Sequence, residues 1–170
     1  MISYLQIENL SKAFGVTKLF ENLTFSIGKN QKTALIAKNG TGKTTLLNII
    51  ANYETPDTGT VTFQNDITIG FLPQIPNFNS GNTVIKEMYE LNDTRVNLII
   101  EYEEALIKND ENKLNKLIPQ MDTYNAWDFE VKVKQILTQL HITNFQQNIS
   151  ELSGGEKKRL ALAKVLIKDP

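Results

Sequence analysis

The segment AKNGTGKTT, from Ala37 to Thr45, combines glycines, a lysine and hydroxyl residues at a spacing that suits phosphate chemistry. It lies between the apolar run TALIA and a helical stretch. Glycines let the backbone curl so that N–H groups point at phosphate oxygens, and a helix N-terminus adds partial positive charge. Lys43 would then reach the β- and γ-phosphates, and the Thr44 hydroxyl would ligate Mg²⁺. We therefore predict a phosphate loop whose contacts are Asn39, Gly40, Thr41, Gly42, Lys43, Thr44 and Thr45.

The alternative is a glycine turn before an amphipathic helix that happens to carry a lysine. The strand–loop–helix context and the rarity of the pattern favour the phosphate loop. One departure concerns Ala37, because the usual pattern has glycine at that position. If Ala37 had a positive φ, the alanine would cost about 1 kcal/mol, whereas a negative φ would make it nearly neutral.

A second motif, LSGGE, covers Leu152 to Glu156 and leads into a helical stretch. Serine followed three residues later by glutamate is a capping box, which by itself needs no function. Two consecutive glycines at a helix start are nevertheless destabilising unless the backbone must approach another group closely. A serine hydroxyl and free amides at a helix N-terminus form an anion site, so we expect Ser153, Gly154, Gly155 and Glu156 to face a phosphate.

The two motifs together resemble the nucleotide-binding domain of the ATP-binding cassette (ABC) superfamily, over essentially the whole chain. This resemblance implies ATP and Mg²⁺ as ligands, with Gln74 in GFLPQ as the glutamine that contacts Mg²⁺ and the attacking water. It also implies that Phe14 in SKAFG stacks on adenine. The alternative for Gln74 is an ordinary turn glutamine after Pro73, and the alternative for Phe14 is a core residue of the β subdomain.

In this family the motif at Ser153 binds nucleotide held by a second cassette, so the implied partner is another cassette in the same protein or a homodimer. The N-terminal segment and MDTYNAWDFEVKVKQILTQLHI resemble the first cassette of ABC-F proteins, which are soluble tandem ATPases that act on ribosomes. Ribosome or RNA association is implied by resemblance alone, because residues 75–150 hold more acidic than basic residues. The alternatives are the ATPase subunit of a membrane transporter and a nucleotide-binding module without turnover.

The elements that must position these residues show two sequence patterns, strand-like in the first part of the chain and helical in the second. Strand-like runs occupy the first part: ISYLQIE, LTFSIG, TALIA, TVTFQ and ITIGFL, interrupted by a helix over Lys43–Asn52. Helical spacing follows from Thr83, with apolar residues at Val84, Ile85, Met88 and Leu91, a break at Pro119, a helix over Tyr124–Leu140 and a last helix near Gly155. A polar stretch over 109–115 indicates a turn between helices.

We therefore predict an α/β P-loop ABC ATPase fold with an antiparallel β subdomain, an incomplete parallel core sheet and a helical subdomain. The predicted parts are 1–74 for the β and phosphate-loop part, 75–150 for the helices with an arm-like insertion, and 151–170 for the LSGGE motif and its helix. Charges on the inserted helices are interpreted as a solvated face.

Composition excludes several other classes. The chain has 170 residues, 41% hydrophobic and 22% charged, which suits one globular domain or part of one. It has no cysteine and one histidine, which rules out disulfides and thiolate metal sites. No apolar run reaches the ~20 residues of a membrane helix, and no signal peptide is evident, so a cytoplasmic protein is expected.

The family's strand that ends in Asp-Glu, with its Mg²⁺ ligand and catalytic glutamate, has no counterpart here, and His141 precedes the LSGGE motif. We expect an N-terminal fragment with no catalytic residue of its own and an exposed sheet edge. Hydrolysis of ATP is expected of the parent protein and not of this chain alone.

Overall fold

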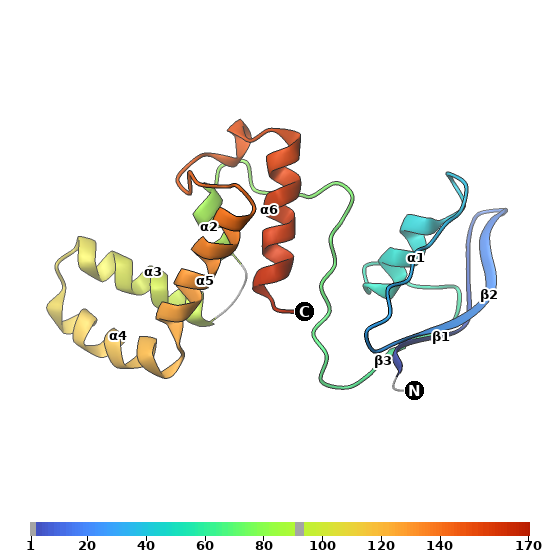
Figure 1. Cartoon of the computed structure of the whole chain (residues 1–170), viewed down its shortest axis with the longest axis horizontal. Coiled ribbons are helices and arrows are strands. Elements are labelled where there is room, and N and C mark those ends of the chain that lie inside the picture. Colours follow the sequence, from blue (N-terminus) through green and yellow to red (C-terminus); the bar gives the residue numbers. More distant parts are fainter. Residues whose placement is uncertain (1–2, 91–93) are drawn as a thin grey trace. The chain divides into compact units, whose positions relative to one another are not determined.

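The structure is a computed structural model that describes residues 3–90 and 94–170. The chain divides into two compact units, residues 1–69 and residues 70–170, whereas the sequence placed a division after residue 74 (Figure 1). The predicted strand residue Ile2 and the predicted helix residue Leu91 lie outside the described residues.

The first unit is a three-stranded antiparallel sheet with one helix. Its strands have the order β2-β1-β3, with bounds β1 (Ser3–Phe14), β2 (Thr17–Gly28) and β3 (Thr58–Phe63). A two-residue loop joins β1 to β2, and Gly15 takes its first position with a φ of 57°, which favours glycine. Helix α1 (Lys43–Ile50) buries Leu46 and Ile49 against β1. The core of this unit therefore lies between β1 and the helix that follows the predicted phosphate loop.

The second unit is helical. It contains α2 (Val84–Tyr89), α3 (Thr94–Ile107), α4 (Glu111–Thr123), α5 (Ala126–Gln139), the short 3₁₀ helix η1 (Ile149–Glu151) and α6 (Gly154–Ile167). In Figure 1, α3 and α4 form a hairpin at the end of this unit away from α6. The turn between them contains Asn109 with a φ of 50°, and Asp110 caps α4, as the polar stretch predicted. Buried side chains from α2, α3, α4, α5 and α6 form one continuous core.

Two predicted strands are not formed. TALIA (33–37) and ITIGFL (67–72) have no strand assignment, so the predicted parallel core sheet is absent from residues 3–90 and 94–170. A strand is stabilised by a neighbouring strand that pairs its backbone groups, and no such partner lies among the described residues. The Ile36 side chain is 90% exposed, so apolar character alone did not produce a strand here.

The helix boundaries differ from the predictions in smaller ways. Pro119 lies inside α4 and does not separate two helices, because the buried Leu117 and Met121 hold the helix on both sides of it. The missing N–H removes a single backbone bond, which tertiary packing offsets here. Helices α1 and α5 end one to two residues inside their predicted bounds, the usual uncertainty of helix ends.

Candidate functional site

The predicted phosphate loop is shaped by two left-handed glycines. Gly40 has a φ of 81° and Gly42, the N-cap of α1, a φ of 89°. A Cβ on Gly42 would lie 2.9 Å from the Leu19 Cβ of strand β2, so both conformation and space require glycine at this position. The tight approach of Gly42 to β2 fixes the point at which α1 begins.

Lys43 folds back over the loop. Its Nζ donates to the backbone oxygens of Ala37 at 2.8 Å and of Lys38 at 2.7 Å, and the Thr41 hydroxyl also donates to Lys38 O at 2.8 Å. The ammonium group thus lies within the curl of the loop, where neutral carbonyls are its partners. A phosphate group would replace these neutral acceptors with charged ones, which form stronger hydrogen bonds.

The N-terminus of α1 keeps its amides available. The N-cap Gly42 has no side chain to accept from them, and the first turn has no acidic residue. The amides of Lys43, Thr44 and Thr45 therefore have no intrahelical partner, and the positive end of the helix dipole is not neutralised within the helix. This arrangement favours an anion at the start of α1.

Ala37 does not disturb the loop. The positive φ angles around it belong to Gly40 and Gly42, and Ala37 is not in the left-handed region. Of the two possibilities raised by the sequence, the structure supports the one in which alanine is nearly neutral.

Phe14 is the last residue of β1 and is 55% exposed, so it is not a core residue of the sheet. Its ring lies 5.6 Å from the Lys12 Nζ, measured to the ring centroid. Exposure of an aromatic face is what stacking on a base requires. The stacking role itself remains a prediction.

Gln74 belongs to the second unit, in an exposed bend of the segment that leads to α2. Just before it, Gly70 passes close to the C-terminal end of α6: a Cβ there would lie 2.6 Å from Val165 Cγ1. The Thr44 hydroxyl and the Gln74 amide oxygen are hard oxygen donors of the kind Mg²⁺ prefers. The chemistry of both side chains therefore suits the predicted role as Mg²⁺ ligands. Thr44 belongs to the first unit and Gln74 to the second.

The LSGGE motif forms the complete capping box that the sequence predicts. Ser153 N donates to Glu156 Oε2 at 2.8 Å, the Ser153 hydroxyl donates to the same oxygen at 2.7 Å, and Glu156 N donates to Ser153 Oγ at 3.3 Å. The side-chain and backbone hydrogen bonds from Ser153 lower the pKa of Glu156, and Arg159 adds to this effect. The carboxylate is thus held ionised at the start of α6.

The two glycines of this motif have no packing role in the described chain. A Cβ on Gly154 would meet nothing within 4 Å, and one on Gly155 would meet only Arg159 Nη1 at 3.8 Å and Ser153 Oγ at 4.0 Å. Neither has a positive φ. Since alanine would fit both positions and suit the helix better, the glycines leave an open backbone surface at the N-terminus of α6.

One buried network was missed by sequence reasoning. Glu87 of α2, only 2% exposed, accepts from Lys164 Nζ of α6 at 2.6 Å and from Asn82 Nδ2 at 2.9 Å. The sequence interpretation placed the charges of this region on a solvated face, and Glu87 contradicts it. No local signal distinguishes Glu87, because its partner lies 77 residues further along the chain.

Two absences apply to residues 3–90 and 94–170. No group of three or more His, Cys, Asp or Glu side chains there is arranged to hold a metal ion. No helix in this part of the chain has the length and apolar character needed to cross a membrane.

Comparison with known proteins places this geometry in a family. The ABC transporter family model matches residues 20–170, so the chain belongs to the ABC transporter family. It is an ATP-binding cassette, and the resemblance inferred from the sequence is confirmed. The α/β fold class is confirmed as well.

Relatives of two kinds are similar to the chain. It is 37% identical over 174 residues to the uncharacterized ABC transporter ATP-binding protein YfmR of Bacillus subtilis. The matched region covers 98% of this chain and 28% of YfmR. The chain is 26% identical over 175 residues to the energy-dependent translational throttle protein EttA of Mycobacterium tuberculosis, with coverages of 96% and 31%. The chain therefore spans less than a third of the length of these two relatives.

The fold has solved counterparts. The ATP-binding subunit of an ABC transporter has a TM-score of 0.70 and 16% identity to the chain, covering 99% of this chain and 63% of that one. At this identity the likeness concerns the fold alone.

Proposed function

We propose that the chain binds Mg·ATP through residues 39–45 and offers residues 153–156 to nucleotide held by a second cassette. The observation that carries the proposal is the loop around Lys43, whose ammonium group lies on two carbonyls of the loop beside the uncapped start of α1. Such a loop combines a cation with amides that have no intrahelical partner, and both suit a triphosphate. The ATP-binding class of the relatives supports it.

Different residues of the chain would bind different parts of Mg·ATP. The amides of 40–45 and Lys43 bind the phosphates, and the exposed ring of Phe14 stacks on the base. The Thr44 hydroxyl and the Gln74 amide oxygen would each serve as a ligand of Mg²⁺, which would supply charge that offsets the charge of the phosphates. Gln74 is neutral and would orient a water molecule without accepting its proton.

The second half of the proposal concerns closure. Among the described residues, a Cβ on Gly154 or Gly155 would meet no atom closer than 3.8 Å, and this open backbone supports a ligand presented from outside. Ser153 and these amides would bind the γ-phosphate of nucleotide on another cassette, so that ATP holds two cassettes together. In the full-length protein we propose that hydrolysis of ATP reverses this closure.

We further propose a cytoplasmic, ABC-F type role on the ribosome for the full-length protein. Support comes from the resemblance in the sequence and from the relative EttA, which is named an energy-dependent translational throttle protein. The alternative is the ATP-binding subunit of a membrane transporter, which is favoured by the relative YfmR, named an ABC transporter ATP-binding protein. A nucleotide-binding module without turnover is the third reading.

The roles are separated by one fractionation experiment on the protein at its natural length. Ribosomes and membranes are sedimented separately with the non-hydrolysable analogue AMP-PNP or with ADP, for the wild type and for Ser153→Arg. The proposal predicts AMP-PNP-dependent association with ribosomes that Ser153→Arg abolishes, because the arginine blocks the phosphate site at α6. Nucleotide-independent ribosome binding, or association with membranes alone, would contradict the ribosomal role.

A further inference from the structure

Lys12 lies near the end of β1, and its side chain is only 12% exposed. Its polar contacts are with residues 54–57 and not with the predicted phosphate loop. Its Nζ donates to Thr55 O at 2.7 Å and lies 3.4 Å from Asp57 Oδ1 and 3.6 Å from Glu54 Oε1. A carbonyl and two carboxylates thus neutralise the ammonium group inside the first unit. A cation paired in this way has little attraction left for a ligand's phosphates.

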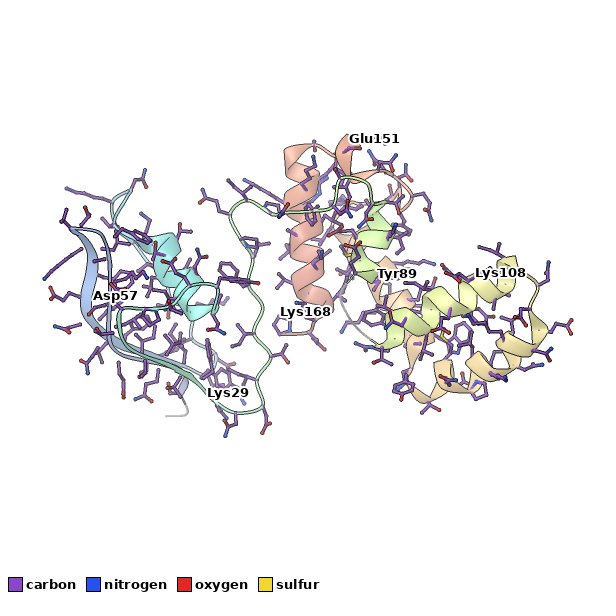
Figure 2. All side chains as sticks on the ribbon, turned by 180° about the vertical axis from the view of Figure 1, so that it is seen from behind. Lys29, Asp57, Tyr89, Lys108, Glu151 and Lys168 are labelled. Carbon is purple, nitrogen blue, oxygen red and sulfur yellow. The ribbon has the colours of Figure 1, made fainter. Side chains whose placement is uncertain are left out.

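The same turn holds the backbone next to Phe14. Asp57, labelled in Figure 2, accepts from Ala13 N at 2.8 Å through its other carboxylate oxygen, and its own N–H donates to Ser11 O at 3.0 Å. Asp57 therefore contacts both Lys12 and the residue that precedes Phe14. The last residues of β1 are fixed to the turn before β3 by side-chain and backbone bonds together.

The Phe14 ring lies against this network. The Lys12 Nζ is 5.6 Å from the ring centroid, within the range of a cation–π contact, while more than half of the side chain remains exposed. An exposed ring on a hairpin end would otherwise sample several rotamers and would lose that freedom on stacking. A ring already held by Lys12 loses less freedom when it binds a flat ligand.

We propose that Lys12 is a positioning residue for base recognition, which holds Phe14 in the pose that stacks on the purine ring of the nucleotide. The inference rests on the proposed nucleotide site and adds a residue to it. Because Lys12 acts through the aromatic ring, it contributes to binding of ligands that carry a base and not to binding of phosphate chains alone. Its carboxylate partners make it a part of the scaffold of the site.

The test compares two ligands at this one site in the protein at its natural length. A low concentration of the photolabel 8-azido-ATP is used, and only labelled peptides from this chain are counted, so that another cassette does not contribute. ATP and inorganic tripolyphosphate, which has no base, then compete for labelling. The variants are Lys12→Met, Lys12→Arg, Phe14→Leu and the double variant Lys12→Met/Phe14→Leu.

We expect Lys12→Met to weaken competition by ATP roughly threefold and to leave tripolyphosphate unchanged. Lys12→Arg should retain most of the ATP affinity, because arginine also places a cation over the ring. Phe14→Leu should weaken ATP alone, and adding Lys12→Met to it should cause little further loss. This non-additivity would show that Lys12 acts through the ring.

Three results would contradict the inference, each in a distinguishable way. Equal loss of ATP and tripolyphosphate in Lys12→Met would show a merely structural role for Lys12. An unchanged ATP affinity in Lys12→Met with a reduced one in Phe14→Leu would overturn the inference and leave the base contact intact. An unchanged ATP affinity in Phe14→Leu would overturn the proposed base contact and the role of Lys12 together.

Discussion

At the scale of single residues, Lys43 carries the largest expected effect on nucleotide binding. Lys43→Ala removes a charge-assisted contact with phosphate and should weaken ATP binding by about 2 kcal/mol, roughly thirtyfold in Kd. Titration calorimetry with Mg·ATP measures this change. Ala37→Gly is the matched control in the same loop, and its Kd should change by less than about tenfold because Ala37 is not strained. An unchanged Kd in Lys43→Ala would remove the phosphate-loop assignment.

A substitution at Gly155 should change the stability of the protein and the ATP-driven closure of two cassettes in opposite directions. Gly155→Ala should stabilise the protein by up to about 1 kcal/mol, since alanine suits a helix and would meet nothing closer than 3.8 Å. The same Cβ should obstruct the approach of a partner's nucleotide and weaken ATP-driven compaction. Urea unfolding and small-angle scattering with and without ATP measure the two effects. Gly81→Ala, in a loop of the same unit with a nearest contact at 3.5 Å, is the control and should leave compaction unchanged.

At the scale of elements, the start of α6 depends on the ionisation of Glu156. Its pKa lies below the ordinary value of 4.5, so the folded state favours the carboxylate. The stabilisation is therefore fully present above the unfolded pKa and is lost as the pH falls through the folded pKa. Glu156→Gln keeps a hydrogen-bonding side chain but does not titrate.

The difference in unfolding free energy between the wild type and Glu156→Gln should shrink as the pH falls from 6 to 3, in urea titrations at fixed temperature. A difference that stays constant over this range would mean that the charge of Glu156 does not contribute to the cap.

The ion pair between Glu87 of α2 and Lys164 of α6 leads to a second prediction at the scale of elements. Lys164→Met removes the cation that pairs with the buried Glu87 side chain and should destabilise the protein by about 3 kcal/mol. The double variant Lys164→Met/Glu87→Gln removes the charge as well, while the new amide oxygen still accepts from Asn82. Urea unfolding should show that it recovers most of the loss. A double variant as unstable as Lys164→Met alone would show that the lysine acts through packing.

Prediction from the sequence succeeded where a structure is decided locally. The turn at Asn109, the start of α1 and the capping box at Ser153 depend on residues close together in the chain, so the sequence pattern predicted them. Prediction failed where a structure depends on contacts with residues far away in the chain. The run TALIA has strand composition, but no strand lies beside it among the described residues, and Glu87 has a partner 77 residues away.

At the scale of the whole molecule, the 170-residue chain alone should bind ATP without turning it over. Hydrolysis needs a positioned acceptor for the water proton, which contributes about 10² to 10⁴-fold. Gln74 is neutral, and the Glu156 carboxylate is engaged by Ser153 in the capping box. Phosphate release at saturating Mg·ATP measures turnover, with Lys43→Ala to subtract contaminating activity. Lys43-dependent turnover near or above ~1 s⁻¹ would reveal a catalytic base within these residues.

The separation of the two hydrophobic cores along the chain bears on how the protein is made. Among the described residues, the first core lies between Leu5 and Phe63, and the second core begins at Phe78. Synthesis proceeds from the N-terminus at a rate slow enough for domains to fold as they emerge. The sheet that carries Phe14 and the loop of Lys43 can therefore bury its apolar residues before α6 has been translated. The predicted phosphate loop would reach its folded form on the nascent chain, ahead of the helix that begins after Ser153.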